Sequence, residues 1–360
     1  MSTPFKPIDF LSRDVRVDRR DDGTIILQSN HRLKPYEKHV PAFLAKWSAE
    51  APDRVWLAQR RGPDREWLKL TYGEARRQVD AVTQALIERG FGPDKPVMIL
   101  SSNSIEFALL SMAAMQARAP LAPVSPAYSV MSQDHSKLRY VFDLIKPGLV
   151  FVQNGEIYAR ALKALDLEGV LLVHVDKAPP GMQSLPWSEL LATRPTEAVA
   201  RSVAAIEPGT IAKFLFTSGS TGMPKAVINT QEMMCANLAM GQMARTRRPE
   251  DPPGVMLDWL PWNHTMGGNA TFQGNLADGG TTYIDDGKPL PGLFEETLRN
   301  LREISPTYFA NVPAGYAMLA TALENDDALA RRFFKNLNSL AYGGATLPSD
   351  LYERMETLAV

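Results

Sequence analysis

The residues best suited to chemistry form one short segment, Thr217–Lys225, which reads TSGSTGMPK. Its two glycines, Gly219 and Gly222, permit backbone angles closed to other residues, so free N–H groups can converge on an anion. Hydroxyl groups add further hydrogen-bonding groups, from Thr217, Ser218, Ser220 and Thr221. Lys225 adds a positive charge. Together these groups predict a loop that holds the phosphates of a polyphosphate.

The segment differs from a Walker A loop, which ends in GK[ST] and opens a helix. Here Pro224 separates glycine from lysine, and apolar runs at Ile211–Phe216 and Ala226–Asn229 predict a strand on each side. A strand–loop–strand arrangement is a flap rather than a helix N-terminus. Read as a generic Ser/Gly/Thr run, the same residues would also fit a surface turn.

The complete nine-residue string resembles the signature loop of the adenylate-forming superfamily, which contains acyl-CoA synthetases, luciferases and peptide-synthetase adenylation domains. The resemblance covers almost the whole chain. It implies that Lys225 is catalytic and that ATP, Mg²⁺ and CoA take part in the reaction. The phosphate-binding residues it implies are Thr217, Ser218, Gly219, Ser220, Thr221, Gly222 and Lys225.

A second segment, Leu260–Gly268, reads LPWNHTMGG. It is predicted to join a strand to a helix, which is where α/β sheets place ligands. The segment resembles the second superfamily motif, which implies a catalytic role for His264, placed between the acyl group and the thiol tunnel. Trp262, Met266 and Gly267 would then border the acyl and adenine groups, although His264 alone would also fit a structural role. Amino-acid-activating relatives hold the substrate ammonium with an aspartate here; this segment has none, which predicts a carboxylic acid without an ammonium group.

A third segment, Ala341–Leu347, reads AYGGATL, and its strand ends in a glycine pair. It resembles the superfamily segment whose backbone borders adenine and the acyl pocket, which implies adenine or acyl binding at Gly343, Gly344 and Ala345. A simple tight turn is the alternative interpretation. Three further residues would fit either an acyl pocket or a core, namely Asn311, Tyr316 and Met318.

The bulk composition excludes several classes of function. The 39 basic and 40 acidic residues nearly cancel, so no electrostatic attraction to nucleic acid or to an anionic membrane is expected. The single cysteine, Cys235, rules out an internal disulfide and fits a reducing, cytoplasmic compartment. The apolar stretch Phe107–Ala117 is far shorter than the ~20 residues of a membrane-spanning helix. The five histidines show no metal-ligand spacing, so no metal ligand is predicted.

The chain alternates short apolar runs with helical patterns, which predicts an α/β fold with helix-covered, largely parallel sheets. We expect an N-terminal arm at 1–35, a first α/β subdomain at 36–195 and a second at 196–360 that carries the phosphate loop. A helix near residue 104 is predicted to begin at Asn103, with Glu106 in the capping-box position. The pattern stops inside a predicted helix at 348–360. We therefore expect the second subdomain to be truncated and the mobile C-terminal lid domain, with its lysine, to be absent from this chain.

Three regions, 73–125, 129–152 and 259–286, look most like bacterial feruloyl-CoA synthetases. That likeness implies adenylation of an aromatic acid by ATP and thioester formation with CoA, with ferulate or another hydroxycinnamate as the acid. Without the lid, the 360-residue chain would make little thioester. The alternatives are another aryl- or fatty-acyl-CoA ligase, an enzyme that delivers to a carrier protein, and a non-catalytic relative that binds a nucleotide or acyl ligand.

Overall fold

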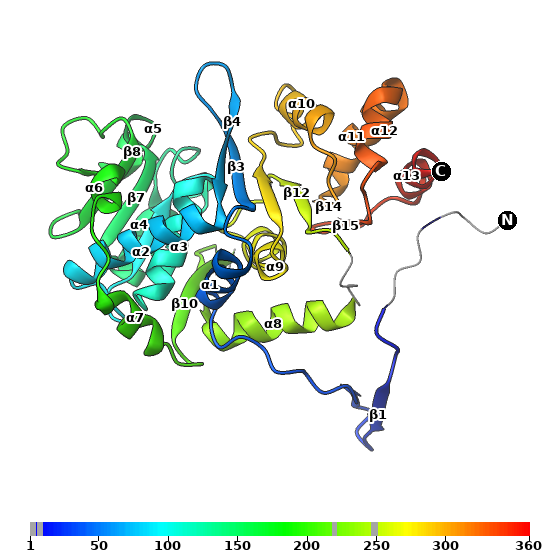
Figure 1. Cartoon of the computed structure of the whole chain (residues 1–360), viewed down its shortest axis with the longest axis horizontal. Helices are drawn as coiled ribbons and strands as arrows, with labels where there is room; N and C mark the ends of the chain where they lie inside the picture. The colour runs from blue at the N-terminus through cyan, green and yellow to red at the C-terminus, as the bar shows by residue number, and fades with distance from the viewer. Residues whose placement is uncertain (1–4, 6–9, 218–221, 246–250) are drawn as a thin grey trace.

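A computed structural model describes residues 5, 10–217, 222–245 and 251–360. A seven-stranded sheet, in the strand order β11-β10-β6-β5-β7-β8-β9, fills one half of the molecule (Figure 1). Its strands are β5 (Val97–Leu100), β6 (Leu121–Pro123), β7 (Leu149–Asn154), β8 (Leu171–Asp176), β9 (Leu185–Pro186), β10 (Ile211–Thr217) and β11 (Lys225–Thr230). Neighbouring strands are parallel except for β10 and β11. The predicted α/β fold with largely parallel sheets is confirmed.

Helices bury both faces of this sheet, which explains why its central strands are continuous apolar runs. The helices α2 (Tyr72–Glu88) and α3 (Ile105–Gln116) share one core with β5, and α4 (Ser136–Ile145) and α5 (Gly155–Leu162) share another. A capping box begins α2: the Thr71 hydroxyl accepts from the Glu74 N–H at 3.2 Å, and the Glu74 carboxylate accepts from the Thr71 N–H at 2.9 Å.

A second sheet has the order β12-β13-β3-β4 and lies beside the parallel pair β14–β15. Its strands are β3 (Val55–Arg61), β4 (Glu66–Thr71), β12 (Val255–Asp258) and β13 (Thr281–Ile284), and the pair consists of β14 (Tyr308–Asn311) and β15 (Ser339–Tyr342). The Thr307 N–H donates to the Val255 carbonyl at 2.9 Å, which joins the pair to β12. One face is covered by α10 (Phe294–Glu303), α11 (Pro313–Asn325), α12 (Asp327–Phe334) and α13 (Ser349–Ala359).

The remaining helices connect the sheets. They are α1 (Pro41–Glu50), η1 (Pro126–Tyr128), α6 (Trp187–Leu191), α7 (Glu197–Ala204), α8 (Gln231–Ala244), the π-helix η2 (Met266–Phe272) and α9 (Gln273–Ala277). The pair η2–α9 is the helical part to which the segment Leu260–Gly268 was predicted to lead. Among the described residues, no helix is long and apolar enough to cross a membrane.

The division of strands between the two sheets does not follow the order of the chain on either side of residue 195. The strands β10 and β11 follow that position in sequence but belong to the seven-stranded sheet, whereas β3 and β4 precede it and belong to the second sheet. A division into 36–195 and 196–360 therefore separates strands that are hydrogen-bonded to each other. The apolar pattern locates strands but carries no information about which strand pairs with which, so the pairing was not predictable.

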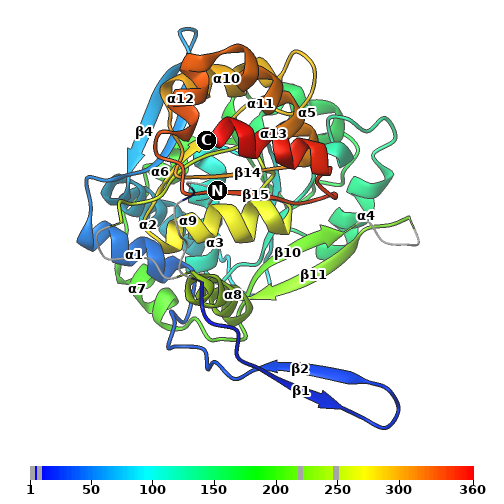
Figure 2. The ribbon, with the colours of Figure 1, turned by 90° about the vertical axis from the view of Figure 1, so that its right-hand side faces the viewer.

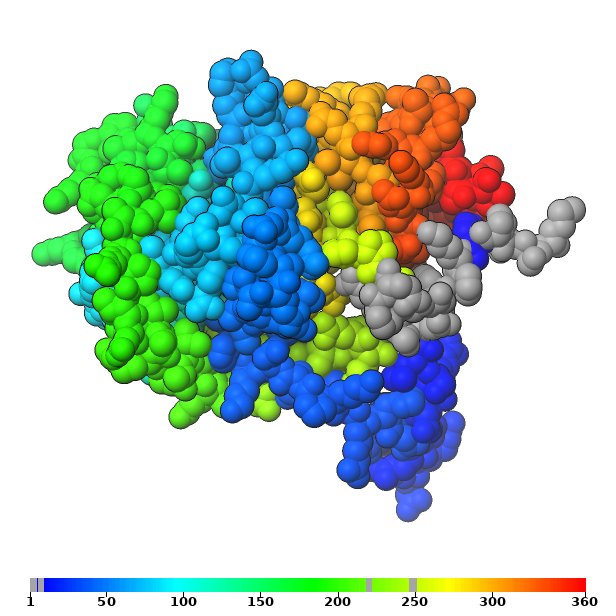
Figure 3. Space-filling view, viewed as in Figure 1, coloured from blue at the N-terminus to red at the C-terminus, as the bar shows by residue number. Residues whose placement is uncertain are grey.

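The N-terminal arm contains a two-stranded hairpin, β1 (Val15–Arg19) and β2 (Ile25–Ser29). It stands away from the body in all three overall views (Figure 1, Figure 2 and Figure 3). The arm meets the body where the Leu11 N–H donates to the Ala244 carbonyl at 3.2 Å, beside a bridge between Phe10 and Arg245. The arm thus holds the end of α8.

One local prediction is wrong by a single residue. The N-cap of α3 is Ser104, whose hydroxyl accepts from the Phe107 N–H at 3.0 Å. The Asn103 side chain instead spans the strand-to-helix segment, because it donates to the Leu260 carbonyl at 2.9 Å and accepts from the Trp262 N–H at 2.9 Å. The hydrogen bond of Asn103 with Trp262, 159 residues away in sequence, uses the side chain that would otherwise have capped the helix.

Candidate functional site

The predicted phosphate flap is an antiparallel hairpin, in which β10 pairs with β11 and Thr217 lies opposite Lys225. The strand–loop–strand arrangement expected from the sequence is therefore present. Thr217 and Lys225 are exposed at the end of the ladder next to the connecting segment, and Gly222 has a left-handed φ of 89°. Four predicted phosphate-binding residues lie outside the described residues, namely Ser218, Gly219, Ser220 and Thr221.

One face of this hairpin is directed toward η2. The Asn269 side-chain amide in η2 donates to the side-chain oxygen (Oδ1) of Asn229 at 3.0 Å, so the Asn229 side chain of β11 points to that side. Alternate residues of a strand share a face, which puts Lys225 on the same side as Asn229. The hairpin's cation and the helix that follows His264 thus lie on one side of the flap.

Lys213 is a feature that sequence reasoning missed. It lies opposite Asn229 in the ladder, on the same face, and only 3% of it is exposed. Burial lowers the pKa of Lys213 to about 7, because the charged form loses hydration. Its only sequence signal is a lysine inside the apolar run Ile211–Phe216. The strand that leads into the flap therefore carries an amine that is easily neutralised.

The segment around His264 is held at the carboxyl end of β12. Its turn is closed by the His264 N–H, which donates to the Pro261 carbonyl at 3.0 Å, and His264 itself is exposed. Asp258 anchors both sides of the turn by accepting from the Leu260 N–H at 2.9 Å and from the Thr271 hydroxyl at 2.5 Å. Burial raises the pKa of Asp258 to about 7. The exposed imidazole thus stands on a rigid, buried support.

Trp262 packs inward rather than forming an exposed wall. Its indole is 2% exposed, stacks on Phe272 with a centroid distance of 4.1 Å, and meets Phe107 edge-on at 5.4 Å. These aromatic contacts attach the His264 turn to the hydrophobic core. A direct contact between Trp262 and an acyl group stays a prediction, and the observed packing favours a supporting role.

The glycines after His264 are required by the fold. A Cβ on Gly267 would lie 2.5 Å from the Pro261 carbonyl oxygen, and a Cβ on Gly268 would lie 2.4 Å from the Trp262 carbonyl oxygen. Only glycine lets η2 approach the preceding turn this closely. Gly267 therefore serves close packing of the chain on itself, and its contact with a ligand remains a prediction.

The third segment is brought into contact with the second. A Cβ on Gly343 would lie 2.8 Å from the Met266 sulfur, so the Met266 side chain covers this glycine. Gly344 follows with a left-handed φ of 84°, and both Gly344 and Ala345 are exposed. The backbone at the end of β15 thus lies bare beside the residue that begins η2. Met266 and Gly343, which are 77 positions apart in sequence, thus lie in contact.

The other three candidates belong to the core side of β14. Asn311 is fully buried, and its side-chain oxygen (Oδ1) accepts from the Trp259 indole N–H at 3.1 Å and from the Val312 N–H at 2.8 Å. Tyr316 is buried with its hydroxyl within hydrogen-bond distance of two backbone carbonyls, and Met318 packs in the same core. These residues shape the strand ends rather than the exposed surface.

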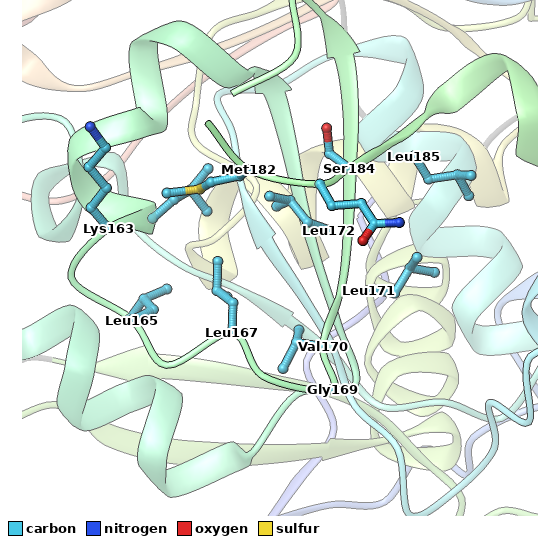
Figure 4. A pocket seen from close by; sticks show the side chains of 12 residues that line it. Lys163, Leu165, Leu167, Gly169, Val170, Leu171, Leu172, Met182, Ser184 and Leu185 are labelled. Carbon is cyan, nitrogen blue, oxygen red and sulfur yellow. The ribbon is translucent and has the colours of Figure 1, made fainter. Parts of the chain in front are cut away.

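A hollow of about 700 Å³ lies elsewhere, at the β8–β9 edge of the seven-stranded sheet. Aliphatic side chains such as Leu165, Leu167 and Met182 line it, together with Lys163 and Ser184 (Figure 4). None of the residues singled out from the sequence lines it. Among the described residues there is also no group of three His, Cys, Asp or Glu side chains able to hold a metal ion.

Comparison with known proteins agrees with the fold. A family model described as AMP-binding enzyme matches residues 44–359. A methyl-dioxo-octahydroindenyl-propanoyl:CoA ligase of Mycobacterium tuberculosis is 26% identical over 88% of this chain and 59% of its own length. The long-chain-fatty-acid–CoA ligase ACSBG2 of Xenopus laevis is 23% identical over 72% of this chain and 35% of its own. The chain thus spans less than two thirds of the length of either relative.

A solved structure gives the same architecture. The luciferase-like enzyme from the nonluminescent Zophobas morio mealworm superposes with a TM-score of 0.71, at 18% identity, over 95% of this chain and 73% of that one. Such a likeness establishes the fold of the described residues. Three of its segments meet on one surface, namely the flap, the His264 turn and the end of β15.

Proposed function

Because this chain belongs to the AMP-binding enzyme family, we propose that the protein activates a carboxylic acid with ATP and transfers the acyl group to CoA. The convergence of the three segments is the observation that carries the proposal. The flap is tied to η2 through Asn229 and Asn269, and η2 is tied to the end of β15 through Met266 and Gly343. The hairpin that carries the proposed phosphate loop therefore lies on the same side as the exposed His264 and the exposed end of β15.

The chemistry has two steps. A carboxylate oxygen attacks the α-phosphorus of ATP, giving an acyl-adenylate and releasing pyrophosphate. The CoA sulfur then attacks the acyl carbon, giving the thioester and releasing AMP. Carboxylate is a poor electrophile, and the mixed anhydride of the first step overcomes that. Mg²⁺ enters with ATP as part of the substrate.

Each segment has a task in these steps. Lys225 and the hydroxyl groups of the flap neutralise and orient the departing pyrophosphate, since positive charge and N–H donors stabilise the charge that develops there. The Gly344–Ala345 backbone borders the adenine, and His264 stands beside the acyl carbon where the thiol arrives. Orientation of two substrates on one surface supplies much of the rate enhancement in such transfers.

The acid is proposed to be aromatic, with ferulate or another hydroxycinnamate as the first candidates. The sequence likeness to feruloyl-CoA synthetases in three regions supports this choice. A relative named for long-chain fatty acids is the reason to keep a fatty-acyl substrate as the second candidate. Delivery to a carrier protein, and ligand binding without turnover, are the further alternatives.

The test is acid-dependent exchange of radiolabelled pyrophosphate into ATP by the full-length protein, followed by AMP release with and without CoA. We expect exchange with hydroxycinnamates and AMP release that depends on free CoA. The variant Lys225→Ala removes the flap's cation and is expected to lower exchange by roughly 100-fold without altering the unfolding midpoint. The exposed strand residue Lys69 gives the matched control, Lys69→Ala, with unchanged exchange.

The outcomes separate the alternatives. Exchange with fatty acids alone would replace the aromatic proposal, and AMP release without any need for CoA would favour a carrier-protein acceptor. Equal exchange in Lys225→Ala and the parent protein would contradict the role given to the flap. Tight binding of ATP or acid without any exchange would favour a binding protein.

A further inference from the structure

The two faces of the β14–β15 pair differ sharply in composition. Phe309 and Leu340 lie opposite each other in the ladder and point into the core formed with α11 and α12. The alternate residues must point the other way, since successive side chains of a strand occupy opposite faces. These residues are Tyr308 and Ala310 on β14, followed on β15 by Ser339, Ala341 and then Gly343 just beyond the strand. We call them the outer face.

One end of the outer face lies at the proposed reaction centre. Met266 covers Gly343, and Met266 is two residues from His264. Gly343 is also the residue before the exposed Gly344–Ala345 backbone. An acyl group whose carboxyl carbon lies beside His264 therefore has its body directed along β15, over residues that carry no more than a methyl or hydroxymethyl group.

The other end of the outer face carries a cluster of hydrogen-bonding groups. The Arg245 guanidinium donates to the Ser339 hydroxyl at 3.3 Å and lies 5.4 Å from the centre of the Tyr308 ring. Ser339 lies directly opposite Tyr308 in the ladder. Four strand positions separate Ser339 from Gly343, which is ~13 Å. That span accommodates a carboxyl group, a short linker and an aromatic ring.

Arg245 is available to a ligand. Its guanidinium is exposed to solvent, and its contact with the Ser339 hydroxyl is made through one terminal nitrogen. It is held in place by the N-terminal arm, because Phe10 bridges to it and Leu11 bonds to the preceding residue. Burial raises the pKa of the Tyr308 hydroxyl, which keeps it a neutral donor and acceptor. The cluster thus offers an exposed guanidinium, a phenol and a hydroxyl group at fixed positions.

We propose that Arg245, Tyr308 and Ser339 determine substrate specificity by binding an oxygen substituent at the end of the acyl group remote from its carboxyl. The substrate class is then an aryl acid that carries a hydroxyl or other oxygen on the ring. The inference rests on the proposed function, since it places the acyl group along β15. An ammonium group is disfavoured there because it would face the guanidinium. A plain alkyl chain would displace water from the exposed Arg245 guanidinium without replacing its hydrogen bonds.

The test compares two ligands that differ only in the ring oxygen, 4-hydroxycinnamate and cinnamate. Their dissociation constants are measured by isothermal titration calorimetry in the presence of α,β-methylene-ATP, which cannot form an adenylate, and without CoA. We expect the parent protein to prefer 4-hydroxycinnamate by roughly 10-fold, which is typical of one hydrogen bond to a charged group. Tyr308→Phe removes one hydroxyl, and Arg245→Met removes the cation while keeping much of the side-chain volume.

The proposal expects both variants to reduce the preference below about threefold while the affinity for cinnamate changes by less than twofold. Arg201→Met, on α7 and remote from the cluster, is the matched control with an unchanged preference. An equal loss of affinity for both acids, or an unchanged preference in Arg245→Met, would overturn the specificity role. If the parent protein binds neither acid and catalyses no acid-dependent exchange, the proposed function itself fails, and this inference with it.

Discussion

The candidate site contains two glycine pairs, Gly267–Gly268 and Gly343–Gly344, which look alike in sequence but differ in their surroundings. Gly267–Gly268 has no room for side chains, because carbonyl oxygens of the chain's own turn lie 2.5 and 2.4 Å from the positions a Cβ would take. Around Gly343–Gly344 the neighbours are a flexible methionine sulfur and a valine methyl group at 3.6 Å. The first pair is therefore a packing device, and the second leaves backbone open to a ligand. Glycines within a motif do not by themselves identify a binding surface.

The largest effect expected from this comparison concerns stability. Gly268→Ala forces a methyl group against the Trp262 carbonyl, and the buried support beneath it cannot shift easily. We expect a loss of about 3 kcal/mol in the free energy of unfolding, measured by urea denaturation. Gly241→Ala, in a helix with open space around the residue, is the control and is expected to gain up to about 1 kcal/mol. Equal stability of Gly268→Ala and the parent would contradict the packing role.

The next effect concerns the anchor of the same turn and depends on pH. The pKa of Asp258 is about 7 in the folded protein and lies above the unfolded value, so folding is penalised progressively as pH rises from about 4 to 7. Above pH 7 the penalty is constant. Asp258→Asn removes the penalty, and we expect it to gain about 2 kcal/mol on the parent between pH 4 and pH 8. Urea denaturation at both pH values measures this; a pH-independent difference would show that folding does not raise the pKa of Asp258.

A smaller effect is expected at the second pair, on binding rather than folding. Gly343→Ala displaces the end of the Met266 side chain, which is flexible, and adds a methyl group to the open surface. We expect roughly tenfold weaker binding of the acid, with the free energy of unfolding changed by less than about 0.5 kcal/mol. Calorimetric titration and urea denaturation of the same preparation measure both. Loss of stability without loss of affinity would mean that Gly343 is a packing residue like Gly268.

The smallest effect is expected at Gly344, whose left-handed backbone is strained for any other residue. Gly344→Ala is expected to cost about 1 kcal/mol of stability through φ alone, since its Cβ meets only a valine methyl group. Gly209→Ala, which has open space and no left-handed φ, is the control with little change. A loss as large as that of Gly268→Ala would show that the site is tightly packed around both pairs.

The sequence predicted the parts of this site that depend on local chemistry. The hairpin around Thr217–Lys225 follows from its flanking apolar runs and its glycines, and the bare end of β15 follows from Gly343–Gly344. The parallel arrangement of the sheets also follows from alternating strands and helices. These features need only a few neighbouring residues.

Features that depend on long-range packing were not predictable. The inward orientation of Trp262 is set by Phe272 and Phe107, and the cap at Ser104 is set by the contact of Asn103 with the His264 turn. The outer-face cluster is also a product of register, which pairs Tyr308 with Ser339 and leaves Arg245 beside both. Nothing in the order of these residues along the chain signals their proximity.

The most direct measurement of the central claim is hydrogen–deuterium exchange in the presence of a non-hydrolysable hydroxycinnamoyl-adenylate analogue. The account predicts slower exchange in three segments at once, 222–230, 264–268 and 341–345, with no change along the aliphatic hollow at 162–172. Protection confined to one segment, or centred on 162–172, would contradict the convergence of the flap, the His264 turn and the end of β15 into one site.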